Sequence, residues 1–508
     1  MLKSFFATFF LLATICSLPA QKVSKQPNII IIIADDLGWA DLQCYGSTFY
    51  ETPVLNKLAQ RGIKFMNGYA SCPVCSPTRS SLMTGKYPVK TGVTDWIKGR
   101  QAGGDARPYE KLIAKPIENQ LALKEETIAE LALKNGYKTF YAGKWHLGEE
   151  EQYWPEAQGF QINKGGFSSG SPTGRKNDTT GGYFTPYKNP RLADGPPGEY
   201  LTDRLTNECI QFLDQNHSKP FLLTYALYAV HNPLQAPTAL IKKYQEKQKK
   251  LSQVSGNLFR KDEQWMKNEN GWKQRIIQSN PVYAAMIENM DSNIGRILGK
   301  LDALGISDNT VILFTSDNGG LSTAEGSPTV NGPLRAGKGW LYEGGIRVPV
   351  IMRWPGKIKE NEVSAVPVNT VDFLPTFARL MNPNYVKNND VDGDDIFSLL
   401  SNPNKAKERT LYWHYPHYSN QGGKPGSAIL RDNYKLIYNY EDSTTELYDI
   451  KKDVGETNNL AASHPVIEKE FKQQLFKWLQ KVNAKTPNKN PGYKSNYKPL
   501  AKNGQDDE

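Results

Sequence analysis

The stretch Pro27–Trp39, PNIIIIIADDLGW, predicts the fold of this chain, because a run of five isoleucines gives way abruptly to two aspartates. Successive β-branched residues are typical of a strand that is covered on both faces, as in a mostly parallel sheet between helices. We therefore expect a strand at about residues 28–33. Asp35 and Asp36 follow it, at the carboxyl end where open α/β sheets gather their ligands.

Three further segments end in the same way. TVILFTSDNGG predicts a strand at residues 311–315, and KTFYAGKWHLG and KPFLLTYALYAVHNP predict two more. The polar residues that follow these strands are Asp317 and Asn318, then Lys144 and His146, and finally His231. Four strands are thus expected to direct polar side chains to one rim of the sheet.

Helices are expected between these strands. Thr52 and Pro53 are typical of a helix start and Gly62 of its end, and KEETIAELALKNGY predicts a helix from about Glu125 to residues 135–136. Residues 281–305 predict a long amphipathic helix, and a helix is also expected near residues 466–482. Residues 152–200 are rich in glycine, proline and aromatic residues, which is typical of a long functional loop.

The length of 508 residues favours one large domain with a smaller companion. We predict a signal peptide at residues 1–20, a large N-terminal domain at 21–404, a small antiparallel sheet and helix at 405–487, and a polar tail at 488–508. The apolar run of the first segment is too short to span a bilayer, and no later segment qualifies. The protein is therefore expected to be exported, to the periplasm or beyond, without a stable membrane anchor.

The net charge of +10 favours anionic partners. Because the 62 lysines and arginines are spread along the whole chain, they do not predict a nucleic-acid surface, and an acidic polymer or a small anion is the expected partner. Asn177 lies in a glycosylation sequon that matters only in a host that glycosylates its exported proteins.

Cys72 and Cys75 form a CxxC pair whose spacing alone leaves several interpretations open: a disulfide, a redox pair, half of a zinc site, or two core thiols. The chain has no second CxxC and only six histidines, which disfavours structural zinc. A thioredoxin-like pair is disfavoured because SPTR, a helix start, follows Cys75 directly.

The run from Cys75 to Arg79, CSPTR, resembles the signature of type I sulfatases, although that family often has serine where Thr78 stands. Further segments resemble family motifs in family order: ADDLGW (34–39), GKWHLG (143–148), VHNP (230–233), SDNGG (316–320), AGKGWLYEGGIRVP (336–349), RDNYKLIY (431–438) and ELYDIKKDVGETNNLA (446–461). The resemblance implies an alkaline phosphatase-like α/β fold, with a mostly parallel central sheet flanked by helices and a smaller C-terminal α+β subdomain.

The resemblance also implies roles for the site residues. A maturation enzyme would oxidise Cys75 to formylglycine (3-oxoalanine), and the hydrate of this aldehyde would attack the sulfur of a sulfate ester. Arg79 and Lys144 would hold the hydrate, while His146, His231 and Lys338 would surround the sulfate and the leaving oxygen. His231 is expected to be the general acid, in a role that Lys338 could exchange or share with it.

One divalent cation is expected at the same place. Three carboxylates and an amide, from Asp35, Asp36, Asp317 and Asn318, form a hard oxygen set suited to Ca²⁺, or to Mg²⁺, with residue 75 as a further ligand. Each aspartate alone would be interpreted as a helix cap or a turn residue. His217, His414, His417 and His464 are expected to be ordinary histidines, although His414 and His417 could instead line a substrate pocket.

The expected substrate is a sulfated carbohydrate, such as ulvan, carrageenan, or a glycan with sulfated galactose or N-acetylgalactosamine. Export, basic charge and the aromatic residues of 154–200 favour it. Two alternatives are a phosphodiesterase or phosphonate monoester hydrolase of the same superfamily, and a glycan-binding relative without catalytic activity.

Overall fold

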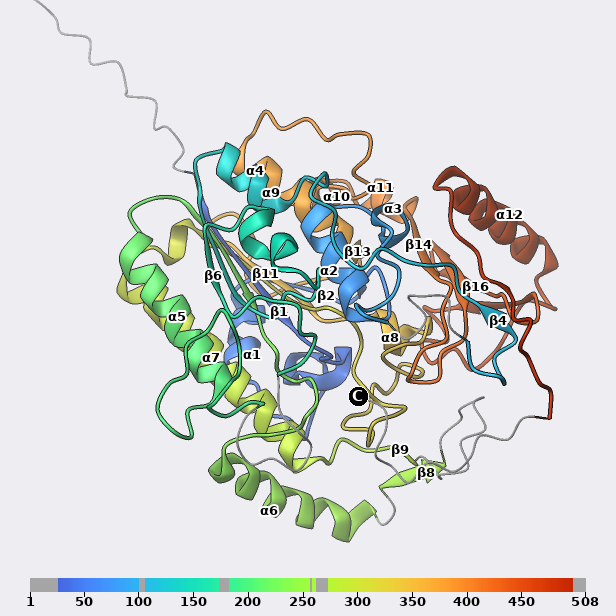
Figure 1. Ribbon diagram of the computed structural model, residues 1–508, viewed down its shortest axis with the longest axis horizontal. Coiled ribbons are helices and arrows are strands. Elements are labelled where there is room, and N and C mark those ends of the chain that lie inside the picture. Colours follow the sequence, from blue (N-terminus) through green and yellow to red (C-terminus); the bar gives the residue numbers. More distant parts are fainter. Residues whose placement is uncertain (1–25, 100–105, 173–181, 256–257, 262–272, 497–508) are drawn as a thin grey trace, which may run out of the picture.

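The computed structural model describes residues 26–99, 106–172, 182–255, 258–261 and 273–496. An eight-stranded sheet runs through the centre of the molecule (Figure 1). Its strands, in spatial order, are β12 (Glu362–Ser364), β2 (Ile63–Phe65), β11 (Val350–Arg353), β10 (Thr310–Ser316), β1 (Asn28–Ala34), β7 (Phe221–Ala226), β5 (Lys138–Gly143) and β6 (Ile162–Lys164).

Strand β1 lies in the interior of this sheet, as its isoleucine run predicts. It pairs in parallel with β10 on one side and with β7 on the other, and β5 and β6 continue the parallel arrangement. Only β11 runs antiparallel to its neighbours β10 and β2. All five isoleucines of β1 are buried, because helices cover the sheet on both faces. The expected mostly parallel α/β fold is confirmed.

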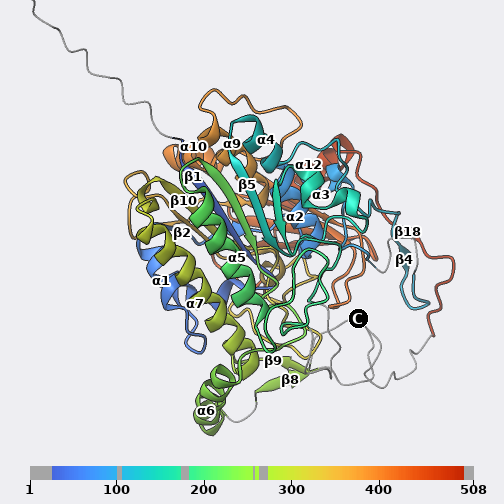
Figure 2. The ribbon, with the colours of Figure 1, turned by 60° about the vertical axis from the view of Figure 1, so that its left-hand side comes forward.

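Two groups of helices cover the sheet. Figures 1 and 2 show α1, α5 and α7 on one face and α2, α4 and α9 on the other, while α6 lies at the lower edge of both views. Their bounds are α1 (Pro53–Gln60), α2 (Cys75–Thr84), α4 (Ile128–Lys134), α5 (Leu201–Asn216), α6 (Thr238–Ser255), α7 (Pro281–Ala303) and α9 (Phe373–Met381). The face of α7 that the sequence marks as apolar is buried against the sheet side of the molecule.

Helix α4 begins at Ile128, three residues after the predicted start at Glu125. The reason is a capping box: the Thr127 side chain accepts from the Glu130 backbone N–H, and the Glu130 carboxylate accepts from the Thr127 N–H. Helix α7 begins where the sequence predicts it, because the side chain of Asn280 accepts from the first free backbone N–H groups.

The segment predicted as a long loop, residues 152–200, contains a strand that the sequence does not reveal. Strand β6 pairs with β5 and forms one edge of the central sheet. It is only three residues long, which leaves too little periodicity to recognise. The predicted signal peptide and Asn177 lie outside the described residues. Across the described ranges, no helix combines the length and the apolar character that crossing a bilayer requires.

Several further elements are short. They are α3 (Pro88–Thr91), α8 (Glu343–Ile346), α10 (Ile396–Ser401) and α11 (Pro403–Lys407), together with the strand pairs β3 (Gly68–Tyr69) with β13 (Val368–Asn369), β4 (Leu112–Ile113) with β18 (Asn488–Lys489), and β8 (Phe259–Lys261) with β9 (Lys273–Arg275). Helix α11 crosses the predicted boundary at residue 404, and β18 begins the predicted tail; the domain division itself stays a prediction.

The C-terminal region folds into a four-stranded antiparallel sheet and one helix. The strands are β14 (Thr410–Tyr415), β15 (Gly426–Arg431), β16 (Tyr434–Asn439) and β17 (Thr444–Asp449), and the helix is α12 (Pro465–Lys481). Along β15 the side chains alternate between two cores: Ala428 and Leu430 pack in one cluster with Tyr69 and Cys72, and Ile429 packs under α12. The expected small α+β unit is therefore present.

A buried ion cluster joins this sheet to α8. Lys435 of β16 is fully buried, and its Nζ lies 3.0 Å from Glu343 Oε1 and 2.8 Å from Glu456 Oε1. Glu343 also pairs with Arg347 at 2.6 Å and accepts a hydrogen bond from the Tyr69 hydroxyl. Because every buried charge has a partner, the cluster fixes the C-terminal sheet against the segment that carries Lys338.

We expect Lys435→Met to lower the free energy of unfolding by about 3 to 5 kcal/mol, because it leaves two buried carboxylates without the cation they share. Urea denaturation followed by circular dichroism measures this loss. Lys477→Met, at an exposed position of α12, is the matched control and should change stability by less than about 0.5 kcal/mol. A loss of under about 1 kcal/mol for Lys435→Met would contradict a structural role for the cluster.

Candidate active site

The carboxyl ends of β1 and β10 bring two polar pairs together. Since the two strands are parallel neighbours in register, Asp35 and Asp36 emerge beside Asp317 and Asn318. The Asn318 Nδ2 donates to Asp36 Oδ1 at 2.8 Å, and the Asp36 backbone N–H donates to Asp317 Oδ1 at 3.2 Å. Three carboxylates and one amide, all at most 2% exposed, therefore share one small volume.

A buried cation lies against each of the three carboxylates. The closest contacts are Lys144 Nζ to Asp35 Oδ2 at 2.8 Å, Arg79 Nη2 to Asp317 Oδ2 at 2.7 Å, and Lys338 Nζ to Asp36 Oδ2 at 2.7 Å. Arg79 Nη1 also donates to the Lys144 carbonyl at 2.7 Å, which links two of these pairs. The six charges balance, so the cluster tolerates its burial.

Cys75 is the first residue of α2 and lies at its amino-terminal end, where the helix dipole favours negative charge. Its Sγ lies 3.4 Å from Nδ1 of His146. The other ring nitrogen, Nε2, contacts the carbonyl oxygen of Ile97, which can only accept. His146 Nε2 therefore carries the proton, and the lone pair of Nδ1 faces Cys75.

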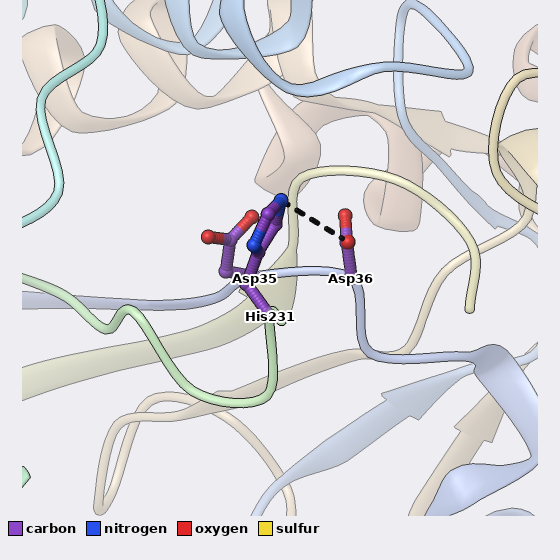
Figure 3. A group of neighbouring side chains, drawn as sticks. All are labelled: Asp35, Asp36 and His231. Atoms are coloured by element: carbon purple, nitrogen blue, oxygen red, sulfur yellow. Dashed lines mark ion pairs between the residues drawn. The ribbon is translucent and has the colours of Figure 1, made fainter. Parts of the chain in front are cut away.

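His231 lies at the open side of the cluster, beside Asp35 and Asp36 (Figure 3). Its Nε2 is 3.6 Å from Asp36 Oδ2 and 3.3 Å from Lys338 Nζ. Its Nδ1 donates to the backbone carbonyl of Asn232 at 2.7 Å, so Nε2 is left as the acceptor for the Lys338 ammonium. Among the described residues, Asp35, Asp36 and His231 are the one group of three carboxylate, thiol or imidazole ligands close enough to hold a metal.

The two neighbouring aspartates have opposite electrostatic surroundings. Burial raises the pKa of Asp35 well above its usual value; the Lys144 charge opposes this shift, while the carboxylates of Asp317 and Asp36 add to it. Burial also acts to raise the pKa of Asp36, but the neighbouring positive charges, that of Lys338 above all, together outweigh it and bring the pKa below its usual range. Burial therefore disfavours the charged form of Asp35, even though Lys144 lies against it.

The histidines are neutral in this environment. Burial lowers the pKa of His231 to about 3; the positive charge of Lys338 adds to this lowering and the carboxylate of Asp36 opposes it. Burial also lowers the pKa of His146 well below its usual value, and the neighbouring charge of Lys144 adds to the effect. Both imidazoles are thus available as hydrogen-bond acceptors near neutral pH.

The donor set fits a hard divalent cation. Asn318 Oδ1 is buried, and no described residue forms a hydrogen bond with it, whereas its Nδ2 is bonded. An unpaired buried amide oxygen is costly unless something binds it. Together with the carboxylate oxygens of Asp35, Asp36 and Asp317, it provides the all-oxygen set that Ca²⁺ or Mg²⁺ prefers.

Two residues that carry site side chains have a left-handed backbone. The φ angles are +61° at Asp36 and +58° at His146, a region that residues other than glycine seldom adopt. Such conformations persist only where the surrounding structure fixes them, and they concentrate at functional sites. The strain therefore agrees with a functional role for this rim.

The other cysteines and histidines lie elsewhere. Cys72 belongs to an apolar cluster under the C-terminal sheet, and all four described cysteines are free thiols, so no disulfide joins Cys72 to Cys75. His414 is buried between the Ser427 hydroxyl and the Lys485 carbonyl, as an ordinary core histidine is. His417 contacts the Thr94 hydroxyl at 2.9 Å.

Backbone contacts hold the separate parts of the site in register. The Lys338 N–H donates to the Gly320 carbonyl, just after Asn318, and the Gly339 N–H donates to the Pro73 carbonyl, just before Cys75. The carbonyl of Ile97 and the close approach of Gly170 to His146 are two contributions that sequence reasoning missed. Neither leaves a signal in the sequence, because both depend on backbone position.

The chain matches two family patterns. The one described as Sulfatase matches residues 27–383, and the one described as N-sulphoglucosamine sulphohydrolase, C-terminal, matches residues 336–485. The two matches overlap in the segment that contains Lys338 and α8. Together they account for the central sheet and for the C-terminal sheet.

Individual relatives agree with these matches. The chain is 32% identical to a sulfatase of Formosa agariphila, and the match covers 92% of this chain and 91% of that protein. It is 29% identical to human arylsulfatase A, and this match covers 90% of this chain and 88% of that protein. Its fold is similar to the crystal structure of Ps i-CgsB in complex with k-i-k-neocarrahexaose, with a TM-score of 0.70, 27% identity, and coverage of 89% and 93% of the two chains.

We expect Gly170→Ala to reduce kcat on an aryl sulfate by about tenfold to a hundredfold, because misplacing a reacting group by about 1 Å has effects of this size. A Cβ at residue 170 would lie 2.3 Å from Cε1 of His146 and would push the imidazole away from Cys75. Steady-state kinetics measure the effect. Gly299→Ala, where a Cβ on α7 meets nothing within 4 Å, is the control and should keep wild-type kinetics. Equal kcat values for the two variants would refute the role of Gly170.

Proposed function

The chain belongs to the sulfatase family and is a sulfuric ester hydrolase, and on this premise we propose that it hydrolyses sulfate esters of a carbohydrate at the site around Cys75. The observation that carries the proposal is the convergence of three carboxylates, one amide and three cations beside a buried cysteine at the carboxyl ends of β1 and β10. A sulfate ester needs a nucleophile, fixed positive charge and a proton donor, and each has a candidate in this set.

Residue 75 is the proposed nucleophile. Oxidation of Cys75 to formylglycine by a maturation enzyme would supply an aldehyde whose hydrate attacks sulfur, and re-formation of the aldehyde would release the sulfate. His146 is suited to orient this residue and to accept a proton from it, because its Nδ1 lone pair faces Sγ at 3.4 Å. The amino terminus of α2 favours negative charge at the same atom.

Three cations are proposed to bind the charged groups of the reaction. Arg79 is paired with Asp317 and Lys144 with Asp35, two of the carboxylates that could bind a metal ion. The charges of these two cations compensate negative charge that forms on residue 75. Lys338 lies nearer the open side, where its ammonium can bind a sulfate oxygen or the bridging oxygen of the ester. Because all three are buried and held by hydrogen bonds, they need no rearrangement when substrate binds.

His231 and Lys338 are proposed to share the protonation of the leaving alcohol. Nε2 of His231 is 3.3 Å from Lys338 Nζ, so both groups can contact the same leaving oxygen, and the Lys338 ammonium carries a proton near neutral pH. Among the site residues, only the His231 side chain is appreciably exposed to solvent. The alcohol part of a bound ester would extend toward solvent, and His231 therefore lies on the side of the leaving group.

Asp35, Asp36, Asp317 and Asn318 are proposed to hold one Ca²⁺ or Mg²⁺ ion, with residue 75 as a further ligand. The bound ion supplies positive charge that polarises the sulfate group. The unpaired Oδ1 of Asn318 supports this assignment.

A sulfated polysaccharide, or an oligosaccharide derived from one, is the proposed substrate. A relative of similar fold was crystallised with k-i-k-neocarrahexaose, and carrageenan, ulvan and glycans with sulfated galactose or N-acetylgalactosamine are the first substrates to examine. The net charge of +10 favours such polyanions. Residues 1–20 are proposed to direct export to the periplasm or beyond.

The decisive test compares wild type with Cys75→Ala on a panel of sugars sulfated at defined positions. We expect the substitution to reduce sulfate release by about a thousandfold or more, because it removes the nucleophile. Ion chromatography of free sulfate provides the rate, and mass spectrometry of the peptide that contains residue 75 reports its oxidation. Cys44→Ala, at a partly buried position outside the site, should retain wild-type activity.

The same panel separates the alternatives. Release of phosphate from phosphodiesters or phosphonates in preference to sulfate would favour the phosphonate hydrolase type. Affinity for sulfated sugars without turnover, with Cys75 unmodified, would favour a glycan-binding protein. Full activity of Cys75→Ala would overturn the proposed mechanism.

Removal of divalent ions with a chelator is expected to lower sulfate release by at least about tenfold, and Ca²⁺ or Mg²⁺ should restore it. Independently of activity, a saturating ion should stabilise the folded state by about 2.7 kcal/mol at 100 times its Kd. Asn318→Ala should weaken this stabilisation, because it removes the buried Oδ1. Identical thermal stability of the wild type with and without ions would refute the metal site.

A further inference from the structure

The site is open to solvent on one side only. The catalytic and metal-type residues are at most 6% exposed, apart from His231, whose side chain is 17% exposed. Lys338 lies next to His231, with their nitrogens 3.3 Å apart. The part of a substrate that extends beyond the sulfate must therefore pass these two residues.

A fixed carboxylate lies at this opening. Asn232, which follows His231, donates from Nδ2 to Glu325 Oε2 at 3.3 Å. Gln421, from the C-terminal region, donates from Nε2 to Glu325 Oε1 at 2.5 Å. Gln421 is itself buried, and its backbone carbonyl accepts from the indole N–H of Trp340 at 2.8 Å. Two amides from distant parts of the chain thus orient the Glu325 carboxylate.

Within the part of the chain that the structure describes, no cation is paired directly with this carboxylate. The side chain of Glu325 is exposed, and its partners among the described residues are the two neutral amides, with no ion pair. It is nevertheless near the site: burial acts to lower the pKa of Lys338, but negative charge, that of Asp36 above all and also that of Glu325, raises it above its usual value. An unpaired carboxylate beside a pocket for an anionic ester is unfavourable for binding unless it contributes to selectivity.

We propose that Glu325, held by Asn232 and Gln421, is a specificity-determining residue that selects sugars with a neutral hydroxyl group next to the scissile sulfate ester. A hydroxyl can donate a hydrogen bond to the carboxylate, whereas a second sulfate or a carboxylate at that place is repelled. The inference rests on the proposed sulfatase function and adds to it the class of sugar that is turned over: one with a single anionic substituent at the reacting end.

The test uses the monosulfated galactoside that the wild type hydrolyses fastest, and the same sugar with a second sulfate on the adjacent carbon. The wild type should prefer the monosulfated sugar by roughly tenfold in kcat/KM at low salt, as expected for one like-charge contact. In Glu325→Gln the ratio of the two kcat/KM values, monosulfated over disulfated, should fall toward one, mainly because the KM for the disulfated sugar becomes lower. High salt should narrow the wild-type preference, because it screens exposed charges.

Glu360→Gln, at an exposed glutamate before β12 on the outer edge of the sheet, is the matched control and should keep the wild-type preference. A preference that is unchanged in Glu325→Gln, or a wild type that favours the disulfated sugar, would overturn the inference. Equilibrium binding of both sugars to Cys75→Ser measures the same discrimination without turnover. If the wild type releases no sulfate while Cys75→Ser still discriminates, the proposed function fails and the role of Glu325 stands.

Discussion

The parallel pairing of β1 with β10 is the constraint on which the site depends. Its register sets Ala34 opposite Ser316, so that the next residues of each strand, Asp35 and Asp317, leave the sheet side by side. A shift by one residue would turn each strand's side chains to the other face and separate the carboxylates. The run of identical isoleucines cannot by itself fix this register, since it is buried on both faces. Specific contacts at the two ends of the strand fix it: Asn28 Nδ2 donates to Thr310 Oγ1 at 3.2 Å, and the Asp36 N–H donates to Asp317 Oδ1.

The pairing of buried cations with buried carboxylates is a second constraint on the structure. Around residue 75, Arg79, Lys144 and Lys338 each lie against a carboxylate, and in the C-terminal sheet Lys435 bridges two more. Buried pairs of this kind add little net stability, but breaking one is costly, so they hold the participating segments in one arrangement. Rigid placement is what electrostatic catalysis requires of its charged groups.

The sequence predicts the elements that have strong local signals and the residues that follow them. The isoleucine run, the amphipathic pattern of residues 281–305 and the apolar run of TVILFTSDNGG locate β1, α7 and β10. It does not predict β6, which is three residues long, or the start of α4, which a capping box delays. Glu325 could not be assigned because its partners, Asn232 and Gln421, are distant in the sequence and meet only after folding.

The central position of β1 has a consequence for the timing of biogenesis. This strand is among the first parts of the chain to be synthesised, but its neighbour β10 follows only after more than half of the chain has been made. Until then the sheet cannot close, and such non-local pairing is slow to form. Residue 75, which is only 3% exposed once folded, remains accessible throughout that interval. An enzyme that modifies this residue would therefore have to reach it before the fold is complete.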